Sequence, residues 1–280
     1  METNSAGGTA ASSTHADPAV LVTADEKDPA VAIVTLNRPA KRNALTIELK
    51  EALLAALEGV ATDAGVRAVV LAGSGKSFCV GQDLGEHVQA LEADASTSFD
   101  TVGRHYNPIV ATIATMPKPV IAAINGGAVG AGLGFALACD LRVAAESATF
   151  ATAFSAIGLT ADSGLSASLV HSLGAARATE LLLLGESFDA AQALASGLVR
   201  AVVPVDQVLD TALELARRLA AGPTLAYAEI KKAVAIGAVS PLDTVLEAEG
   251  AAQARLGVTT DHKEAVEAFL AKRRPTFEGR

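Results

Sequence analysis

Residues 118–145, KPVIAAINGGAVGAGLGFALACDLRVAA, constrain the fold more than any other segment. An apolar run, a glycine-rich turn and a second apolar run follow one another directly. This order predicts a strand, a turn, a helix that opens near Ala131 and another strand. Further apolar runs at residues 30–37 and 66–73 end in Asn and Gly and predict buried strands. Strands that alternate with helices indicate the α/β class.

Helical periodicity fills the spaces between these runs. Residues 44–58 predict a helix because four leucines recur at a spacing of four, which places them on one face: Leu45, Leu49, Leu53 and Leu57. The region 85–116 is more polar and helical in parts. Beyond residue 162 the pattern becomes mostly helical, with helices expected at 163–173, 176–184, 190–196, 206–221, 224–237, 242–257 and 262–273.

Composition excludes several classes of protein. Half of the residues are hydrophobic and 19% are charged, which is typical of a globular chain. A formal net charge of −9 argues against nucleic-acid binding. Neither the two cysteines, Cys79 and Cys139, nor the histidines show a metal-ligand spacing, so we expect no metal site.

The N-terminal segment and the hydropathy of the chain indicate where the protein is located. Residues 1–18 are small and polar, and we interpret them as a disordered tail without a signal or transit peptide. No apolar stretch is long enough to cross a bilayer, so we expect no membrane association. The sequence therefore predicts a cytoplasmic protein.

Two phosphate-binding motifs are incomplete. GSGKS at residues 73–77 follows a strand, but a P-loop needs a glycine where Val70 stands. GGAVGAGLGF at residues 126–135 opens a helix, but a dinucleotide fingerprint needs a glycine where Phe135 stands. We therefore set nucleotide binding aside.

The glycine turns still offer unpaired backbone N–H groups. The helix that opens near Ala131 carries N–H groups without intrahelical partners and a positive partial charge. A second glycine turn, CVGQDL at residues 79–84, lies just beyond another strand end. The two turns could converge on one oxygen that becomes negative during a reaction, as in an oxyanion hole. Alternatively, both are tight turns packed for structural reasons, and spacing alone favours this second interpretation.

Asp162 is a lone acid in AFSAIGLTADSG, residues 153–164. It precedes Ser and Gly at the start of a helical stretch, which is typical of an N-cap. It could instead be the acid on which a reaction depends. From the residues alone the cap is favoured, because caps outnumber catalytic acids.

Four segments together resemble the crotonase superfamily of enoyl-CoA hydratases and isomerases, over residues 31–280: TLNRPAKRNAL, KSFCVGQDL, residues 118–144 and AFLAKRRPTFEGR. The resemblance implies an α/β fold, a crotonase-like spiral of ββα units with a C-terminal helical region. We assign residues 19–215 to the spiral core and 216–280 to a helical oligomerisation region. Homotrimers or dimers of trimers, acyl-CoA thioester substrates and no cofactor besides the substrate's coenzyme A follow from the same resemblance.

The resemblance also implies site residues. The backbone N–H groups of Gln82 and Ala131 would form the oxyanion hole for the thioester carbonyl. Residues implied in substrate binding lie along both glycine turns and in the Asp162 segment: Phe78, Cys79, Val80, Gly81, Gly130, Phe154 and Leu159.

The sequence departs from the hydratase pattern at both of its glutamates, whose places are taken by Gly134 and Phe154. Asp162 stands where isomerases of the superfamily carry their acid. The type that isomerises the ring epoxide of phenylacetyl-CoA is most similar, with a matching DSG, although its usual Gly-Gly-Thr is replaced by Gly164-Leu165-Ser166. With the resemblance, the preference for Asp162 changes from cap to catalytic acid.

Three functions follow as hypotheses. The first is isomerisation of a double bond or ring through an enolate, with Asp162 moving the proton inside an apolar wall of Phe154, Ile157 and Leu159, which raises its pKa. The second is hydration of a 2-enoyl-CoA by a non-standard site. The third is non-catalytic acyl-CoA binding. Other polar residues are expected to be structural acids (Asp83 and Asp140) or surface and pocket-wall groups (His87, His105 and Tyr106).

Overall fold

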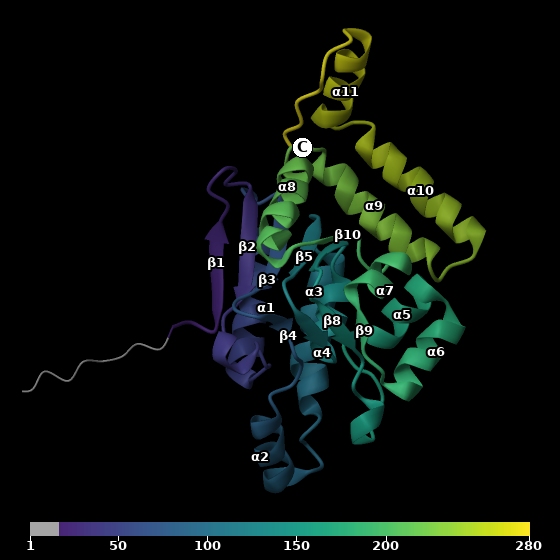
Figure 1. Ribbon diagram of the computed structural model, residues 1–280. Helices are drawn as coiled ribbons and strands as arrows, with labels where there is room; N and C mark the ends of the chain where they lie inside the picture. The colour runs from purple at the N-terminus through teal and green to yellow at the C-terminus, as the bar shows by residue number, and fades with distance from the viewer. Residues whose placement is uncertain (1–16) are drawn as a thin grey trace, which may run out of the picture.

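The computed structural model describes residues 17–280, so most of the tail expected at residues 1–18 lies outside the described residues. Two β-sheets form the centre of the molecule, and helices pack around them (Figure 1). The larger sheet has six strands in the order β1 (Val20–Ala24), β2 (Val31–Leu36), β3 (Ala68–Gly73), β5 (Val120–Ile124), β7 (Leu141–Ala145) and β10 (Ala201–Val203). Its neighbouring strands are parallel except for the β1–β2 pair.

The smaller sheet has four short strands, in the order β4 (Ser77–Cys79), β6 (Gly127–Val129), β8 (Thr149–Ala151) and β9 (Phe188–Asp189). The chain alternates between the sheets: β3 leads to β4, β5 to β6, and β7 to β8. Strands β3, β5 and β7 are neighbours in the larger sheet, and their followers are neighbours in the smaller one. Helices follow each pair, so the chain forms the expected spiral of ββα units.

Helices complete the core, with bounds α1 (Ile47–Thr62), α2 (Leu84–Asp94), α3 (Asn107–Thr115), α4 (Ala131–Ala138), α5 (Leu165–Leu173), α6 (Ala175–Leu184), α7 (Ala190–Ala195) and α8 (Val208–Ala220). Short helical turns cover Pro39–Lys41, Val102–Tyr106, Ser155–Ile157 and Val205–Gln207. A parallel sheet buries both faces. Helix α8 contacts β3, β5 and β7, while α1 contacts β2 and α3.

The leucine pattern predicted a helix at residues 44–58, and the structure has α1 at Ile47–Thr62. All four leucines are fully buried, and α1 begins at Ile47 behind the N-cap Thr46, whose side chain accepts a hydrogen bond from the Leu49 N–H (3.3 Å). Leu45 precedes the helix and pairs with Gln82 in an isolated bridge. The strands β1, β6, β8, β9 and β10 were not anticipated. The last four have only two or three residues, which are too few to show a period.

Three helices form a C-terminal layer that extends away from the sheets: α9 (Thr224–Gly237), α10 (Leu242–Leu256) and α11 (Thr260–Leu270) (Figure 1, yellow-green and yellow). The boundary expected between residues 215 and 216 falls inside α8, which packs on the larger sheet. In residues 17–280, none of the helices combines the length and apolar character needed to cross a membrane.

Candidate active site

The two glycine turns meet at one edge of the smaller sheet. Strands β4 and β6 are parallel neighbours, so the turns that follow them emerge side by side. A Cβ on Gly81 (φ 84°) would lie 3.0 Å from the Val129 carbonyl oxygen and 3.7 Å from the Ala131 nitrogen. A Cβ on Gly132 would overlap the Cys79 carbonyl oxygen. Glycine at these positions therefore allows the two backbones to approach each other.

Two backbone N–H groups remain available at this edge. The Leu45 N–H donates to the Gly81 oxygen (2.8 Å), and the Asp83 N–H donates to the Leu45 oxygen (3.1 Å), so the intervening Gln82 N–H faces away from Leu45. Ala131 is the first residue of α4, where an N–H has no intrahelical partner. Among residues 17–280, neither N–H has an acceptor. Both have the properties expected of oxyanion-hole donors.

Asp162 lies in the loop before α5 and is half-buried. Its carboxylate accepts a hydrogen bond from the Ser163 hydroxyl (2.7 Å). The N-cap of α5 is Gly164, with no side-chain cap, so the interpretation of Asp162 as a helix cap is wrong. Burial raises the pKa of the Asp162 carboxyl above its usual range, although the Ser163 hydroxyl and the Lys50 charge oppose the shift.

The Asp162 loop packs tightly against α4. Ser163 has φ 53° and Gly164 φ 65°, and left-handed backbone is unfavourable for serine. A Cβ on Gly134 would lie 2.6 Å from Ser163 Cβ and 2.8 Å from the Ser163 oxygen. Glycine at position 134 thus makes room for the loop. The acid is therefore placed beside the helix whose first N–H is a candidate oxyanion donor.

Apolar side chains adjoin the same helix start. Phe154 is 9% exposed, and its ring lies 3.8 Å from where a Gly130 Cβ would stand. Leu159 is half-buried and packs on the core, and its N–H donates to the Phe154 oxygen (3.0 Å). Ile157 is 60% exposed, so it does not belong to a buried apolar wall.

The residues at and before the turn at 79–84 differ in what they could offer a substrate. The side chains of Phe78 and Cys79 are fully buried, so a contact of theirs with substrate would involve the main chain. Burial raises the pKa of the Cys79 thiol to about 12, which leaves it protonated at neutral pH. Val80 is half-buried, and Gly81 is buried where the two turns meet.

Sequence reasoning missed Lys50, a fully buried lysine on α1. Its Nζ donates to Gln82 Oε1 (3.2 Å) and to Thr101 Oγ1 (2.6 Å). The Tyr106 hydroxyl donates to the same Gln82 oxygen. Lys50 precedes Leu53 by three and Leu57 by seven residues, so helical periodicity carried a signal of its burial. Tyr106, expected at a pocket wall, is buried within this network.

The other candidates have the expected secondary roles. The Asp83 carboxylate caps α2 by accepting the N–H groups of Gly85 and Glu86, and it pairs with Arg38 (3.1 Å). The Asp140 carboxylate accepts the Val120 N–H (2.7 Å) and pairs with Lys231 Nζ (2.8 Å).

The two histidines, His87 and His105, line the same cavity as Gln82. The His105 ring is hydrogen-bonded to Thr101, and the His87 ring packs edge-on against Phe99. Both line a cavity of about 230 Å³ beside Lys50 and Gln82. Lys50 and Gln82 are themselves among the residues that line this cavity.

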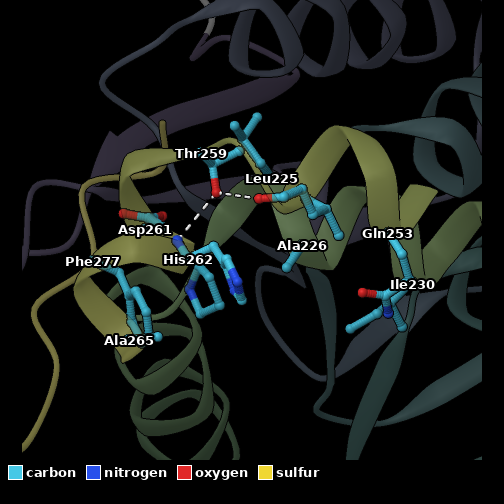
Figure 2. Close-up of a pocket in the computed structure, with 11 residues that line it drawn as sticks. Leu225, Ala226, Ile230, Gln253, Thr259, Asp261, His262, Ala265 and Phe277 are labelled. Carbon is cyan, nitrogen blue, oxygen red and sulfur yellow. Dashed lines mark hydrogen bonds between the residues drawn. The ribbon is translucent and has the colours of Figure 1, made fainter. Parts of the chain in front are cut away.

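A separate cavity of about 300 Å³ lies within the C-terminal layer (Figure 2). Its lining includes Leu225, Ile230, His262 and Phe277, and none of the predicted site residues. Beside it, the buried Asp261 carboxylate accepts the N–H groups of Glu278 and Gly279 and so holds the chain end. This cavity belongs to the packing of the C-terminal layer.

Comparison with known proteins places this geometry in a family. Residues 26–280 match the model of the enoyl-CoA hydratase/isomerase family. The 1,2-epoxyphenylacetyl-CoA isomerase of Escherichia coli K12 is 42% identical over 250 residues, which cover 89% of this chain and 95% of that protein. The 2,3-dehydroadipyl-CoA hydratase of the same organism is 38% identical, covering 89% and 96%.

A solved structure gives the same result. A chain from Mycobacterium abscessus, assigned as an enoyl-CoA hydratase/isomerase, superimposes with a TM-score of 0.89 at 50% identity and covers 94% of this chain and 100% of its own. The family model, the similar sequences and the similar solved structure all agree with the spiral fold described above. The chain therefore belongs to the enoyl-CoA hydratase/isomerase family of the crotonase superfamily.

Proposed function

We propose that the protein isomerises an acyl-CoA thioester through an enolate, shifting a double bond or rearranging a ring, with Asp162 carrying the proton. The observation that carries this proposal is the half-buried carboxylate of Asp162, bonded by Ser163, whose main chain lies against Gly134 of α4. The resemblance implies that Gly134 and Phe154 stand where a hydratase would carry its two glutamates. Neither glycine nor phenylalanine can move a proton.

In the proposed reaction the thioester carbonyl accepts hydrogen bonds from the Gln82 and Ala131 N–H groups. The Asp162 carboxylate removes a proton from C2 of a 3-enoyl-CoA, and the electron pair moves onto the carbonyl oxygen as an enolate. The two N–H groups and the positive end of α4 stabilise that charge. The protonated acid then returns the proton at C4, which gives the conjugated 2-enoyl-CoA without gain or loss of atoms.

Asp162 is suited to both halves of this cycle. A general base works best when its pKa approaches the working pH, and burial moves the pKa of this carboxyl in that direction. In this proposal the apolar side chains of Phe154 and Leu159 would limit the approach of water, which would favour isomerisation over hydration. No redox step and no cofactor besides the coenzyme A of the substrate enters the mechanism.

Hydration of a 2-enoyl-CoA by a non-standard site is the second candidate, because relatives at 38% and 41% identity carry hydratase names. Hydration needs a base for water and an acid for carbon. Asp162 would have to perform both tasks in turn, which makes this candidate the weaker one.

The proposal extends to binding and assembly. Residues Phe78–Gln82 would lie along the coenzyme A portion of the substrate. The C-terminal layer exposes large apolar side chains, among them Val234, Leu242 and Phe269, at 68%, 72% and 82%. Such a surface favours a homotrimer or a dimer of trimers, which light scattering of the purified chain would test.

The decisive experiment replaces Asp162 with Asn and follows conversion of 3-enoyl-CoA to 2-enoyl-CoA by the absorbance of the conjugated thioester. We expect kcat to fall by about 10³-fold, while Asp162→Glu retains part of the activity. An Asp162→Asn enzyme as fast as the wild type would refute the proposal. Wild-type formation of 3-hydroxyacyl-CoA from crotonyl-CoA would favour hydration, and binding without turnover of either substrate would favour a non-catalytic protein.

A further inference from the structure

Lys50 is a buried lysine of the candidate site that has no carboxylate partner in the described part of the chain. It is 1% exposed, and within residues 17–280 no carboxylate oxygen lies within salt-bridge distance of its Nζ. Its contacts are the neutral oxygens of Gln82 and Thr101 and the face of the Tyr106 ring, 5.2 Å away. A buried charge without a paired charge destabilises a fold. A positive group kept in this place therefore calls for a function.

We propose that Lys50 is a positioning residue of the candidate site: its ammonium group fixes the Gln82 side chain and so the turn that carries one candidate oxyanion donor. The inference rests on the proposed isomerase function and adds a residue to it. Lys50 itself need not touch the substrate.

The effect on Gln82 follows from donor and acceptor roles. An ammonium group donates only, so the amide oxygen of Gln82, and not its NH₂ group, must face Lys50. The Tyr106 hydroxyl donates to the same oxygen, which fixes the side chain from two directions. The main chain of Gln82 carries one of the two candidate oxyanion donors. Holding its side chain therefore restricts the turn that aims this N–H.

The effect on Asp162 is electrostatic. The positive charge of Lys50 lowers the pKa of Asp162, against the larger opposing effect of burial. Other charged groups near Lys50 are the acids Asp83, Glu86 and Glu51.

The remaining neighbours come from the 102–106 turn. The Tyr106 phenol stays protonated, because burial raises its pKa. The Thr101 hydroxyl, which accepts from Lys50, also lies 3.0 Å from His105 Nδ1, and burial together with the Lys50 charge lowers the pKa of that imidazole. Burial lowers the pKa of the Lys50 ammonium group, and the charges of the nearby acids oppose that shift, so Lys50 is the buried basic group of this cluster.

The test compares Lys50→Met with Lys118→Met in the full-length enzyme. Lys118 is a matched control, because it is also buried but donates to the main-chain oxygens of Val60 and Asp63, away from the site. We expect Lys50→Met to lower kcat for the 3-enoyl-CoA by about 10- to 100-fold, with KM changed by less than about threefold. The acid limb of its kcat–pH profile should move to higher pH, because loss of the cation makes Asp162 easier to protonate.

Lys118→Met should change the melting temperature without moving the acid limb of the kcat–pH profile. Lys50→Arg keeps the positive charge, so its acid limb should lie closer to that of the wild type than the limb of Lys50→Met does. If Lys50→Met does not fold, Lys50→Gln keeps a donor but lacks the charge and must still move the limb. A folded Lys50→Met or Lys50→Gln enzyme with wild-type kcat and pH profile would overturn the inference. That result leaves the proposed function standing as long as Asp162→Asn is inactive.

Discussion

Two aspartates of this molecule, Asp140 and Asp162, have similar burial but different partners. Both are half-buried, burial raises the pKa of both, and each feels the charge of a lysine. Asp140 receives the Val120 N–H at 2.7 Å and the Lys231 ammonium at 2.8 Å. Asp162 receives only the hydroxyl of its neighbour Ser163 among the described side chains, while Lys50 acts without contact.

The difference shows what separates a structural acid from a candidate catalytic one. Asp140 ties the start of β5 to α9, and its carboxylate is occupied. Asp162 is desolvated to a comparable degree but keeps oxygen lone pairs for a proton from outside the chain. Burial shifts the pKa in either case, and the hydrogen-bond partners decide the role.

Replacing each acid by asparagine gives the largest predicted contrast. Asp162→Asn should lose about 10³-fold in kcat with its melting temperature kept or raised, because an unpaired desolvated charge is removed. Asp140→Asn should keep kcat within about twofold and lose about 1–3 kcal/mol of unfolding free energy, because Lys231 remains without its partner. Steady-state assays and urea unfolding of both variants measure this. Equal loss of activity in both would erase the distinction.

A smaller effect is expected at the contact that places Asp162. In Gly134→Ala the new methyl group meets Ser163 at 2.6 Å, so the loop must move. We expect a loss of about 1–3 kcal/mol in stability and about tenfold in kcat.

Gly59→Ala in α1 is the control for this substitution, because nothing lies within 4 Å of its Cβ. It should stabilise the protein by up to about 1 kcal/mol without changing kcat. Thermal melts and kinetics of the two alanine variants provide the measurement. Unchanged activity in Gly134→Ala would show that the loop's approach to α4 is irrelevant to the reaction.

The smallest predicted effect concerns the one donor of Asp162. The Ser163 hydroxyl lowers the pKa of Asp162 by bonding its ionised form. Ser163→Ala should therefore raise that pKa, so the basic form is lost at a higher pH on acidification. The acid limb of the kcat–pH profile should move upward, while kcat on the plateau falls less than about fivefold.

Ser196→Ala removes a comparable hydroxyl, which donates to the Gln192 main-chain oxygen at the end of α7. Its pH profile should match that of the wild type. A downward shift of the limb in Ser163→Ala would contradict the assigned role of the hydroxyl.

Local patterns in the sequence determined the frame of the fold. The continuous apolar runs of β2, β3 and β5 and the leucine face of α1 are buried as expected, because hydrophobic periodicity reports burial directly. The motif order gave the family and the two glycine turns. The short strands of the smaller sheet escaped, since their pairing, not their composition, defines them.

Tertiary structure alone decided the surroundings of the acid. The sequence alone did not decide whether Asp162 is a helix cap or a catalytic acid, because an Asp-Ser-Gly stretch is compatible with both roles. The structure excludes the cap, because Gly164 is the N-cap residue of α5 and the Asp162 carboxylate accepts its hydrogen bond from the Ser163 hydroxyl. Lys50 lies 112 positions before Asp162 in the chain. It reaches the candidate site only because α1 packs against the turn at residues 79–84, where Lys50 Nζ donates to Gln82. Desolvation and long-range charge depend on distances through space, which no local pattern of residues records.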